Sequence, residues 1–284
     1  MLQKKYLSYP EAIARMVDLE MPYSGADEQA RLAINIISLN FKYDERSSFA
    51  TDSMAKNNLY LDCNTQCDML YRVMKSIGIG EERMEAIFLP RHTILKIDGL
   101  YYETTTGGES PSRVLALDEN EFNRFYPCVA GRLKPSLAFL AFALESRGIS
   151  ATTEQAGEHE SGQDPDAPYA QAIELFKQAL QLVPGNFDTM ANIATCYNDM
   201  RKTKDALYWV EKAIKLNPDE AQFYEIRGFA HALKFLQDGE QADRAGSDED
   251  AKMAKLAKSN ADIWQMRLDK FYEEYLKKNT GKRQ

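Results

Sequence analysis

Cysteine, long apolar runs and an excess of positive charge are all missing or scarce in this chain of 284 residues. Four cysteines are too few for a disulfide scaffold in a chain of this length, which favours free thiols in a reducing compartment. No apolar run reaches the roughly 18 residues of a membrane span, and the net charge of −8 disfavours nucleic acid as the main ligand. We therefore expect a cytoplasmic protein with no membrane span and no nucleic-acid partner. An exported protein that lacks its signal peptide in this chain is the alternative.

The remaining composition is that of an ordinary globular protein, with 44% hydrophobic and 27% charged residues. The length suggests two domains or one large one. The sharpest change in composition covers residues 150–167, SATTEQAGEHESGQDPDA, which contain five acidic residues, no Lys or Arg and no large apolar side chain. Such a segment buries too little apolar surface to offset its ordering entropy. We predict an acidic linker or loop at 150–167.

A repeat with a period of 34 residues follows this segment. Residues 170–186, AQAIELFKQALQLVPGN, are echoed by residues 204–220, KDALYWVEKAIKLNPDE. Each copy predicts an amphipathic helix with small residues where a neighbouring helix approaches closely, and with a proline that ends it. The residues in register are Ala172/Ala206, Phe176/Val210, Ala179/Ala213 and Pro184/Pro218.

A further helix, which carries Ala194 and Tyr197, is predicted just before the second copy. Together with this helix the pattern resembles the tetratricopeptide repeat over residues 168–220. A third, degraded copy begins at 221–235 and keeps Tyr224 and Gly228, but polar residues separate it from a second helix around Asp250–Lys258. The last amphipathic segment, 261–278, is expected to cap the stack. We predict an all-α repeat domain over 168–284, whose first repeat uses an apolar helix at 135–147 as its partner and bridge.

The first half holds one helix with two cysteines. Residues Asp62–Ile77, ended by Gly78, place Cys63 and Cys67 on one stripe with apolar residues. Cys63 lies in the first turn, where unpaired N–H groups and the helix dipole favour a thiolate. Cys67 lies one turn deeper and is expected to be an inert core thiol.

A β-hairpin follows, because Asp98-Gly99 stands between two β-rich runs. With this turn Ile97 pairs with Leu100, so His92 and Glu103 become diagonal neighbours on one face of the hairpin, within side-chain reach. A helix-start cysteine with a histidine and a carboxylate on adjacent strands is the arrangement that a thiol nucleophile needs. His92 would accept the thiol proton and Glu103 would hold the imidazole.

The first half resembles the transglutaminase-like superfamily of papain-related cysteine enzymes, over a core of about residues 25–115. The residues that carry this resemblance are Cys63, then Gly78-Ile79, then PRHTILKIDGLYYETTTGG. The resemblance implies an α+β transglutaminase-like domain at 1–149, with Cys63 as nucleophile, His92 as base and Glu103 as the orienting acid. It is closest to bacterial members that also carry tetratricopeptide repeats. The family usually has a small residue before the cysteine, whereas Asp62 here either caps the helix or disfavours the thiolate.

Other residues near this site are candidates for the oxyanion hole or the cleft. The backbone N–H of Cys63 is the first candidate donor for an oxyanion. The side chains that could contribute are those of Tyr60, Asn64, Gln66 and Tyr101.

These observations predict a cysteine-dependent acyl-transfer enzyme, a protease or amidase acting on peptide or isopeptide bonds rather than a transglutaminase. Its repeats would recruit a protein or peptide, and it would need no cofactor and no metal. One alternative is an inactive transglutaminase-like fold that acts as an adaptor through its repeats. A second is a zinc site, although the Cys-x3-Cys spacing on a helix is unusual for zinc; its ligands would be Cys63, Cys67, His92 and Cys128.

Overall fold

The structure is a computed structural model that describes the chain in several stretches: 9–43, 60–90, 92–106, 114–126, 129–153, 164–238, 243 and 245–258. The chain divides into two compact units, and the boundary falls between Phe139 and Leu140. Each unit has its own secondary structure and its own core, so each is described by itself.

The first unit contains a five-stranded antiparallel sheet with the strand order β6-β5-β4-β3-β7. A short parallel pair, β1 (Lys42–Tyr43) and β2 (Tyr60–Leu61), lies outside this sheet. The 3-10 turn η1 (Glu81–Arg83) leads into β3, and η2 (Thr104–Thr106) follows β5. The strands of the sheet are β3 (Met84–Leu89), β4 (His92–Ile97), β5 (Leu100–Tyr102), β6 (Ala116–Leu117) and β7 (Gly131–Leu133).

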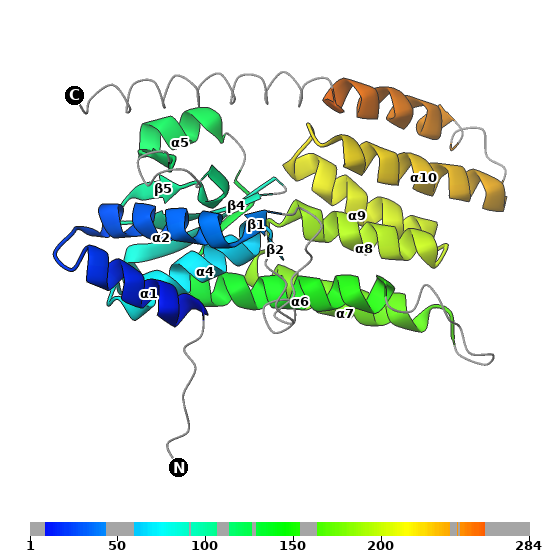
Figure 1. The fold of residues 1–284 in the computed structure, drawn as a ribbon. Coiled ribbons are helices and arrows are strands. Elements are labelled where there is room, and N and C mark those ends of the chain that lie inside the picture. The colour runs from blue at the N-terminus through cyan, green and yellow to red at the C-terminus, as the bar shows by residue number, and fades with distance from the viewer. Residues whose placement is uncertain are drawn as a thin grey trace, which may run out of the picture. The chain divides into compact units, whose positions relative to one another are not determined.

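Helices lie on both faces of this sheet (Figure 1). On one face α4 (Cys63–Ser76) packs against β4, and α1 (Tyr9–Glu20) and α2 (Ala26–Asn40) pack against α4. On the other face lies α5 (Glu119–Phe125). Successive side chains of β5 point to opposite faces of the sheet and contact the helices on each face. The Tyr102 hydroxyl donates to Asp27 of α2, while the Tyr101 ring stacks on Phe122 of α5.

The predicted mixture of helices and a small antiparallel sheet is therefore confirmed for the first unit. The helix predicted at Asp62–Ile77 is α4, and Gly78, with φ of 93°, follows its end. The finer assignment to the transglutaminase-like fold stays a prediction.

The second unit is all-helical over its described residues. Its helices follow one another as antiparallel neighbours, α7 against α8, α8 against α9 and α9 against α10 (Figure 1). The helix α6 (Pro135–Thr153) contains the boundary between the units. The remaining helices are α7 (Ala167–Leu182), α8 (Phe187–Asp199), α9 (Thr203–Leu216), α10 (Ala221–Asp238) and a helix at 245–258.

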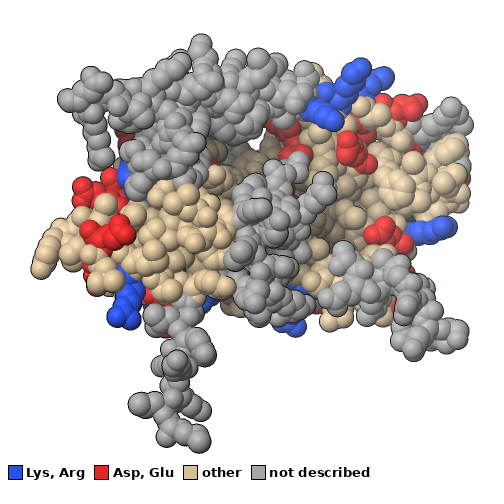
Figure 2. Space-filling model, viewed as in Figure 1, with Lys and Arg blue, Asp and Glu red and all other residues tan. Residues whose placement is uncertain are grey.

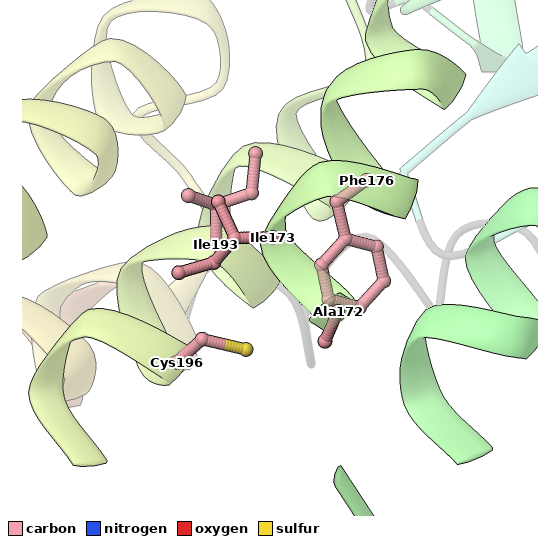
Figure 3. Packing of buried hydrophobic residues seen from close by; sticks show 5 residues of the cluster. All are labelled: Ala172, Ile173, Phe176, Ile193 and Cys196. Carbon is pink, nitrogen blue, oxygen red and sulfur yellow. The ribbon is translucent and has the colours of Figure 1, made fainter. Parts of the chain in front are cut away.

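One hydrophobic cluster joins α7 and α8 (Figure 3). Partly buried side chains from α6 and α9, among them Ala151 and Trp209, pack around it. The buried members are Ala172, Ile173, Phe176, Ile193 and Cys196. Cys196 is therefore a core residue of the second unit.

The small residues of the repeat are buried where helices approach each other. The paired alanines at 172 and 206, and at 179 and 213, are at most 1% exposed. A Cβ added to Gly148 of α6 would lie 2.6 Å from the Phe176 ring, and one added to Gly228 of α10 would lie 3.2 Å from the Asp250 Cβ. Close helix packing therefore depends on these positions, and the sequence pattern predicted this for the four alanines.

The structure differs from the sequence predictions at three boundaries. The helix predicted at 135–147 continues as α6 to Thr153, so 150–153 are helical and not part of the linker, and Ala167 already begins α7. In the third repeat α10 extends to Asp238, and residues 243 and 245–258 are helical, so the second helix already includes residues before Asp250. The core of the predicted linker, 154–163, and the predicted capping helix at 261–278 lie outside the described residues.

Acidic and basic side chains are interspersed on the face of the molecule that Figure 2 shows. Within the described part of the chain, no helix combines the length and the apolar character that a membrane crossing requires.

Phe176 provides a test of the repeat core. Its side chain is 1% exposed, whereas Phe229 on α10 is 54% exposed. We expect Phe176→Ala to lower the free energy of unfolding of the helical unit by about 3–5 kcal/mol, because it removes buried apolar surface and leaves a cavity. Phe229→Ala is the matched control and should change stability by less than about 1 kcal/mol. Urea unfolding followed by circular dichroism measures both, and equal losses would contradict the assignment of Phe176 to the core.

Candidate functional site

The site begins at the N-terminus of α4, where Asp62 caps the helix. Asp62 Oδ1 accepts a hydrogen bond from the Thr65 backbone N–H at 2.7 Å, and the Asp62 N–H donates to Thr65 Oγ1 at 2.8 Å. This reciprocal capping box satisfies two otherwise unpaired donors of the helix end. Burial raises the pKa of the Asp62 carboxyl, although hydrogen bonds from Thr65 oppose the rise. Of the two roles expected for Asp62, the capping role is thus observed directly.

The hairpin of β4 and β5 brings His92 close to Glu103. Asp98 and Gly99 form the turn with φ of 48° and 88°, and Ile97 pairs with Leu100 as predicted. The strand β5 ends at Tyr102, so the register does not extend to Glu103, whose N–H donates to the Leu115 carbonyl oxygen. His92 Nε2 and Glu103 Oε2 nevertheless lie 2.7 Å apart. The predicted proximity of these two side chains is confirmed.

Cys63, at the first residue of α4, is a partner of the same imidazole. Burial alone would lower the pKa of His92, but the Glu103 carboxylate and the hydrogen bond with Cys63 outweigh burial and raise this pKa. Cys63 and Glu103 thus both interact with the His92 imidazole.

Glu103 is 7% exposed, and further donors hold its carboxylate. Oε1 accepts from the Thr105 backbone N–H at 3.2 Å and from its hydroxyl at 2.6 Å, and Oε2 accepts from the Tyr126 hydroxyl at 3.2 Å. Burial raises the pKa of Glu103, but His92 and Thr105 lower it further, so the net direction is downward and the anion is favoured. The sequence analysis missed Tyr126, because nothing in its local pattern relates it to Glu103.

Of the other predicted site residues, Asn64 contacts the Cys63 thiol. Asn64 Oδ1 accepts a long hydrogen bond from the Cys63 thiol, at 3.9 Å. Gln66 is buried on α4, and among the described residues its Oε1 has no hydrogen-bond partner. Tyr60 forms part of β2, but its side chain lies outside the described part of the structure.

Tyr101 belongs to a different cluster. Its side chain is fully buried, and its hydroxyl accepts from Lys96 at 2.9 Å and from Arg132 at 2.8 Å while it donates to Glu119. The structure places Tyr101 on the α5 face of the sheet and gives it no contact with Cys63 or His92 among its described hydrogen bonds. It therefore supports α5 rather than lining a cleft around the thiol.

Cys67 is fully buried, as expected for a core thiol. Its Sγ lies 3.2 Å from the Thr93 carbonyl oxygen and 3.6 Å from Thr104 Oγ1. Burial raises the pKa of this thiol well above its usual range. In the described part of the chain no three His, Cys, Asp or Glu side chains are grouped as metal ligands, and Cys128 of the zinc alternative lies outside that part.

A comparison with known families supports the repeat assignment. A family model described as tetratricopeptide repeat matches residues 169–228, which covers α7, α8, α9 and the start of α10. This part of the chain is thus similar to a class of repeat that typically binds other proteins.

The His92–Glu103 pair gives a pH-dependent prediction. We expect Glu103→Gln to lower the pKa of His92, because the substitution removes the carboxylate that opposes burial. The pKa is measured by NMR titration of the imidazole resonances, with the His92 signal assigned by its loss in His92→Gln. Glu119→Gln, which removes a carboxylate on the other cluster, is the control. An unchanged His92 pKa in Glu103→Gln would contradict the described pair.

The same pair contributes to stability within a defined pH window. The raised pKa of His92 gives a contribution that is complete below its unfolded value of 6.5 and is lost as pH rises through the folded value. The lowered pKa of Glu103 gives one that is complete above 4.5 and is lost as pH falls through the folded value. Both contributions are complete between pH 4.5 and pH 6.5, so the stability deficit of Glu103→Gln should be largest in that range.

The capping role of Asp62 is tested by two substitutions. Asp62→Ala removes the acceptor for the Thr65 N–H and should cost about 1 kcal/mol of unfolding free energy. Asp62→Asn keeps an acceptor oxygen at the same position and should cost less. Chemical unfolding of the two variants side by side measures the difference, and equal stability would show that the cap contributes nothing.

Proposed function

We propose that the first unit is a cysteine-dependent acyl-transfer enzyme that cleaves peptide or isopeptide bonds with a Cys63–His92–Glu103 triad. The observation that carries the proposal is the position of His92, whose imidazole has Glu103 on Nε2 and Cys63 as its second partner. A thiol nucleophile needs a base to take its proton and an anion to orient that base.

In the proposed reaction the Cys63 proton passes to His92, and Sγ attacks the carbonyl carbon of the substrate. The resulting tetrahedral oxyanion is stabilised by the Cys63 backbone N–H at the start of α4, where the helix dipole is favourable. The C–N bond then breaks and His92 returns the proton to the leaving amine, which leaves a thioester. Water, deprotonated by His92, attacks the thioester and releases the acid and the Cys63 thiol.

The environment of the acid and the two thiols is consistent with these roles. Glu103 is held as an anion by His92, Thr105 and Tyr126, so it can stabilise an imidazolium without taking its proton. Cys63 lies at the helix end, whereas Cys67, one turn further, is fully buried and hydrogen-bonded to Thr93. This contrast supports Cys63, which is 7% exposed, rather than Cys67, which is 0% exposed, as the nucleophile.

The repeats would supply the protein partner in this proposal. Residues 169–228 match the tetratricopeptide repeat, and stacked helix pairs of this kind commonly bind peptide segments of other proteins. We therefore propose that the second unit recruits a protein or peptide, which is either the substrate or a tether to it.

An inactive adaptor is the second candidate function. The observation that favours it is the buried Asp62 carboxylate directly before Cys63, because a neighbouring negative charge disfavours a thiolate. In an adaptor the first unit would be a structural domain, and the repeats alone would act.

The rate of Cys63 alkylation decides between the two. We expect iodoacetamide to label Cys63 rapidly at pH 6, where an ordinary thiol with a pKa near 8.5 is almost wholly protonated. His92→Ala should slow this labelling by at least about tenfold, because it removes the cation that stabilises the thiolate. Peptide mass spectrometry over a pH series measures the rates.

Two internal controls accompany this measurement. Cys67 should remain unlabelled in the folded protein, and His231→Ala removes a histidine that is likewise paired with a carboxylate, Asp243, but lies in the repeat unit. Labelling of Cys63 at the rate of an ordinary thiol in both the wild type and His92→Ala would rule out the enzyme. The adaptor would then be preferred.

A further inference from the structure

Tyr126 follows the last residue of α5, and its hydroxyl contacts the Glu103 carboxylate of the proposed triad. It is the C-cap residue of α5, it is buried, and its hydroxyl donates to Glu103 Oε2. His92 Nε2 binds the same oxygen. One carboxylate oxygen is therefore shared between a phenol and the imidazole.

The position of Tyr126 is fixed by the way α5 is held on the sheet. At its start Asp118 and Glu121 form a capping box, and Glu119 accepts a hydrogen bond from Tyr101 and contacts Lys96. In the middle of the helix the Phe122 ring stacks on the Tyr101 ring, with centroids 3.9 Å apart.

The Tyr126 ring lies 5.4 Å from the ring of Phe122. The helix is thus anchored at one end by a polar cluster, in the middle by aromatic stacking, and at its other end by the hydroxyl on Glu103. An element remote in sequence from Cys63 and His92 therefore reaches the acid that orients the base.

We propose that Tyr126 is a positioning residue for the Cys63–His92–Glu103 triad, because its hydroxyl shares Glu103 Oε2 with His92 and so sets how strongly the carboxylate holds the imidazolium. This inference rests on the proposed function. It assigns to α5 a part in the site that the triad residues alone do not reveal.

The expected direction follows from competition at one oxygen. A hydrogen bond to a carboxylate withdraws charge from the oxygen that accepts it, and the loss of one donor strengthens the bond to the other. An imidazolium gains more from a stronger acceptor than a neutral imidazole does. Without the Tyr126 hydroxyl, the protonated form of His92 should be favoured.

Other titratable groups face the pair and must be held constant. From α4 these are Cys63, which is a partner of His92, and Cys67, which interacts electrostatically with Glu103. Asp62 at the cap of the same helix acts on Cys67. None of these three side chains is changed by a substitution at Tyr126, so a shift can be attributed to the hydroxyl.

The test is Tyr126→Phe, which keeps the ring and removes only the hydroxyl. The pKa of His92, measured by NMR, should rise by about half a pH unit, which is about a threefold change in the ratio of imidazolium to imidazole. The pH profile of Cys63 labelling by iodoacetamide should move to lower pH, since the thiolate is paired with a more persistent cation. Replacement of Tyr126 by 3-fluorotyrosine strengthens the donor and should move both readouts the opposite way.

Tyr102→Phe is the matched control. It also removes a buried hydroxyl that donates to a carboxylate, but that carboxylate is Asp27 of α2, on the opposite face of the sheet. It should leave the His92 pKa and the labelling profile unchanged. A purely structural role of Tyr126 would lower the melting temperature and leave both readouts where they are in the wild type.

The outcomes separate this inference from the proposed function. If the wild-type Cys63 labels rapidly at pH 6 but neither Tyr126→Phe nor the fluorotyrosine protein shifts the two readouts, the inference is overturned and the proposed function stands. If Cys63 of the wild type labels as an ordinary thiol, the proposed function fails first, and the inference falls with it. Opposite shifts in the two variants, with none in Tyr102→Phe, support the inference.

Discussion

The burial of the Glu103 carboxylate is the constraint on which the described part of the first unit depends. A charge removed from water is tolerated only when donors surround it. These donors come from distant parts of the chain: His92 from β4, Thr105 from the turn after β5, and Tyr126 from the end of α5. The carboxylate therefore connects the hairpin to α5 on one face of the sheet, while β4, which carries His92, packs against α4 on the other.

The two cysteines of α4 differ in their surroundings because of their positions along the helix. Cys63 and Cys67 are one turn apart in α4. The first lies at the end of the helix, behind the Asp62 cap and beside His92, while the second is enclosed against Thr93 and Thr104. The difference requires no special residue at either position, because the helix end and the strand beneath it supply the two environments.

The parts of the fold that were predictable are those where one local rule decides the geometry. The Asp98-Gly99 turn fixed the pairing of β4 with β5, and with it the proximity of His92 to Glu103. The small residues of the repeat identified the helix contacts, since Ala172 and Ala206 are both fully buried. Helix starts and stops were also close, because capping residues and glycines mark them.

What could not be predicted depends on contacts between residues that are distant in sequence. The bond between Tyr126 and Glu103 spans 23 residues and has no spacing rule behind it. The pairing of β4 with β5 ends at Tyr102, although the Glu103 N–H still donates to the Leu115 carbonyl oxygen next to β6. The helix α6 continues through a stretch of polar composition, where Ala151 packs beside the core of the second unit, so tertiary packing overrides the local preference.

The turn at Asp98 and Gly99 also limits which insertions and deletions the hairpin can accept without a change in its geometry. Side chains of a strand alternate between faces, so an insertion or deletion of one residue between His92 and the turn would move His92 to the opposite face of the sheet. Substitutions in the turn are milder, because they change its stability but not its length. Among relatives that retain the cysteine, the histidine and the acid, the separation of 11 residues between His92 and Glu103 is therefore a more informative character than identity at any single position of the hairpin.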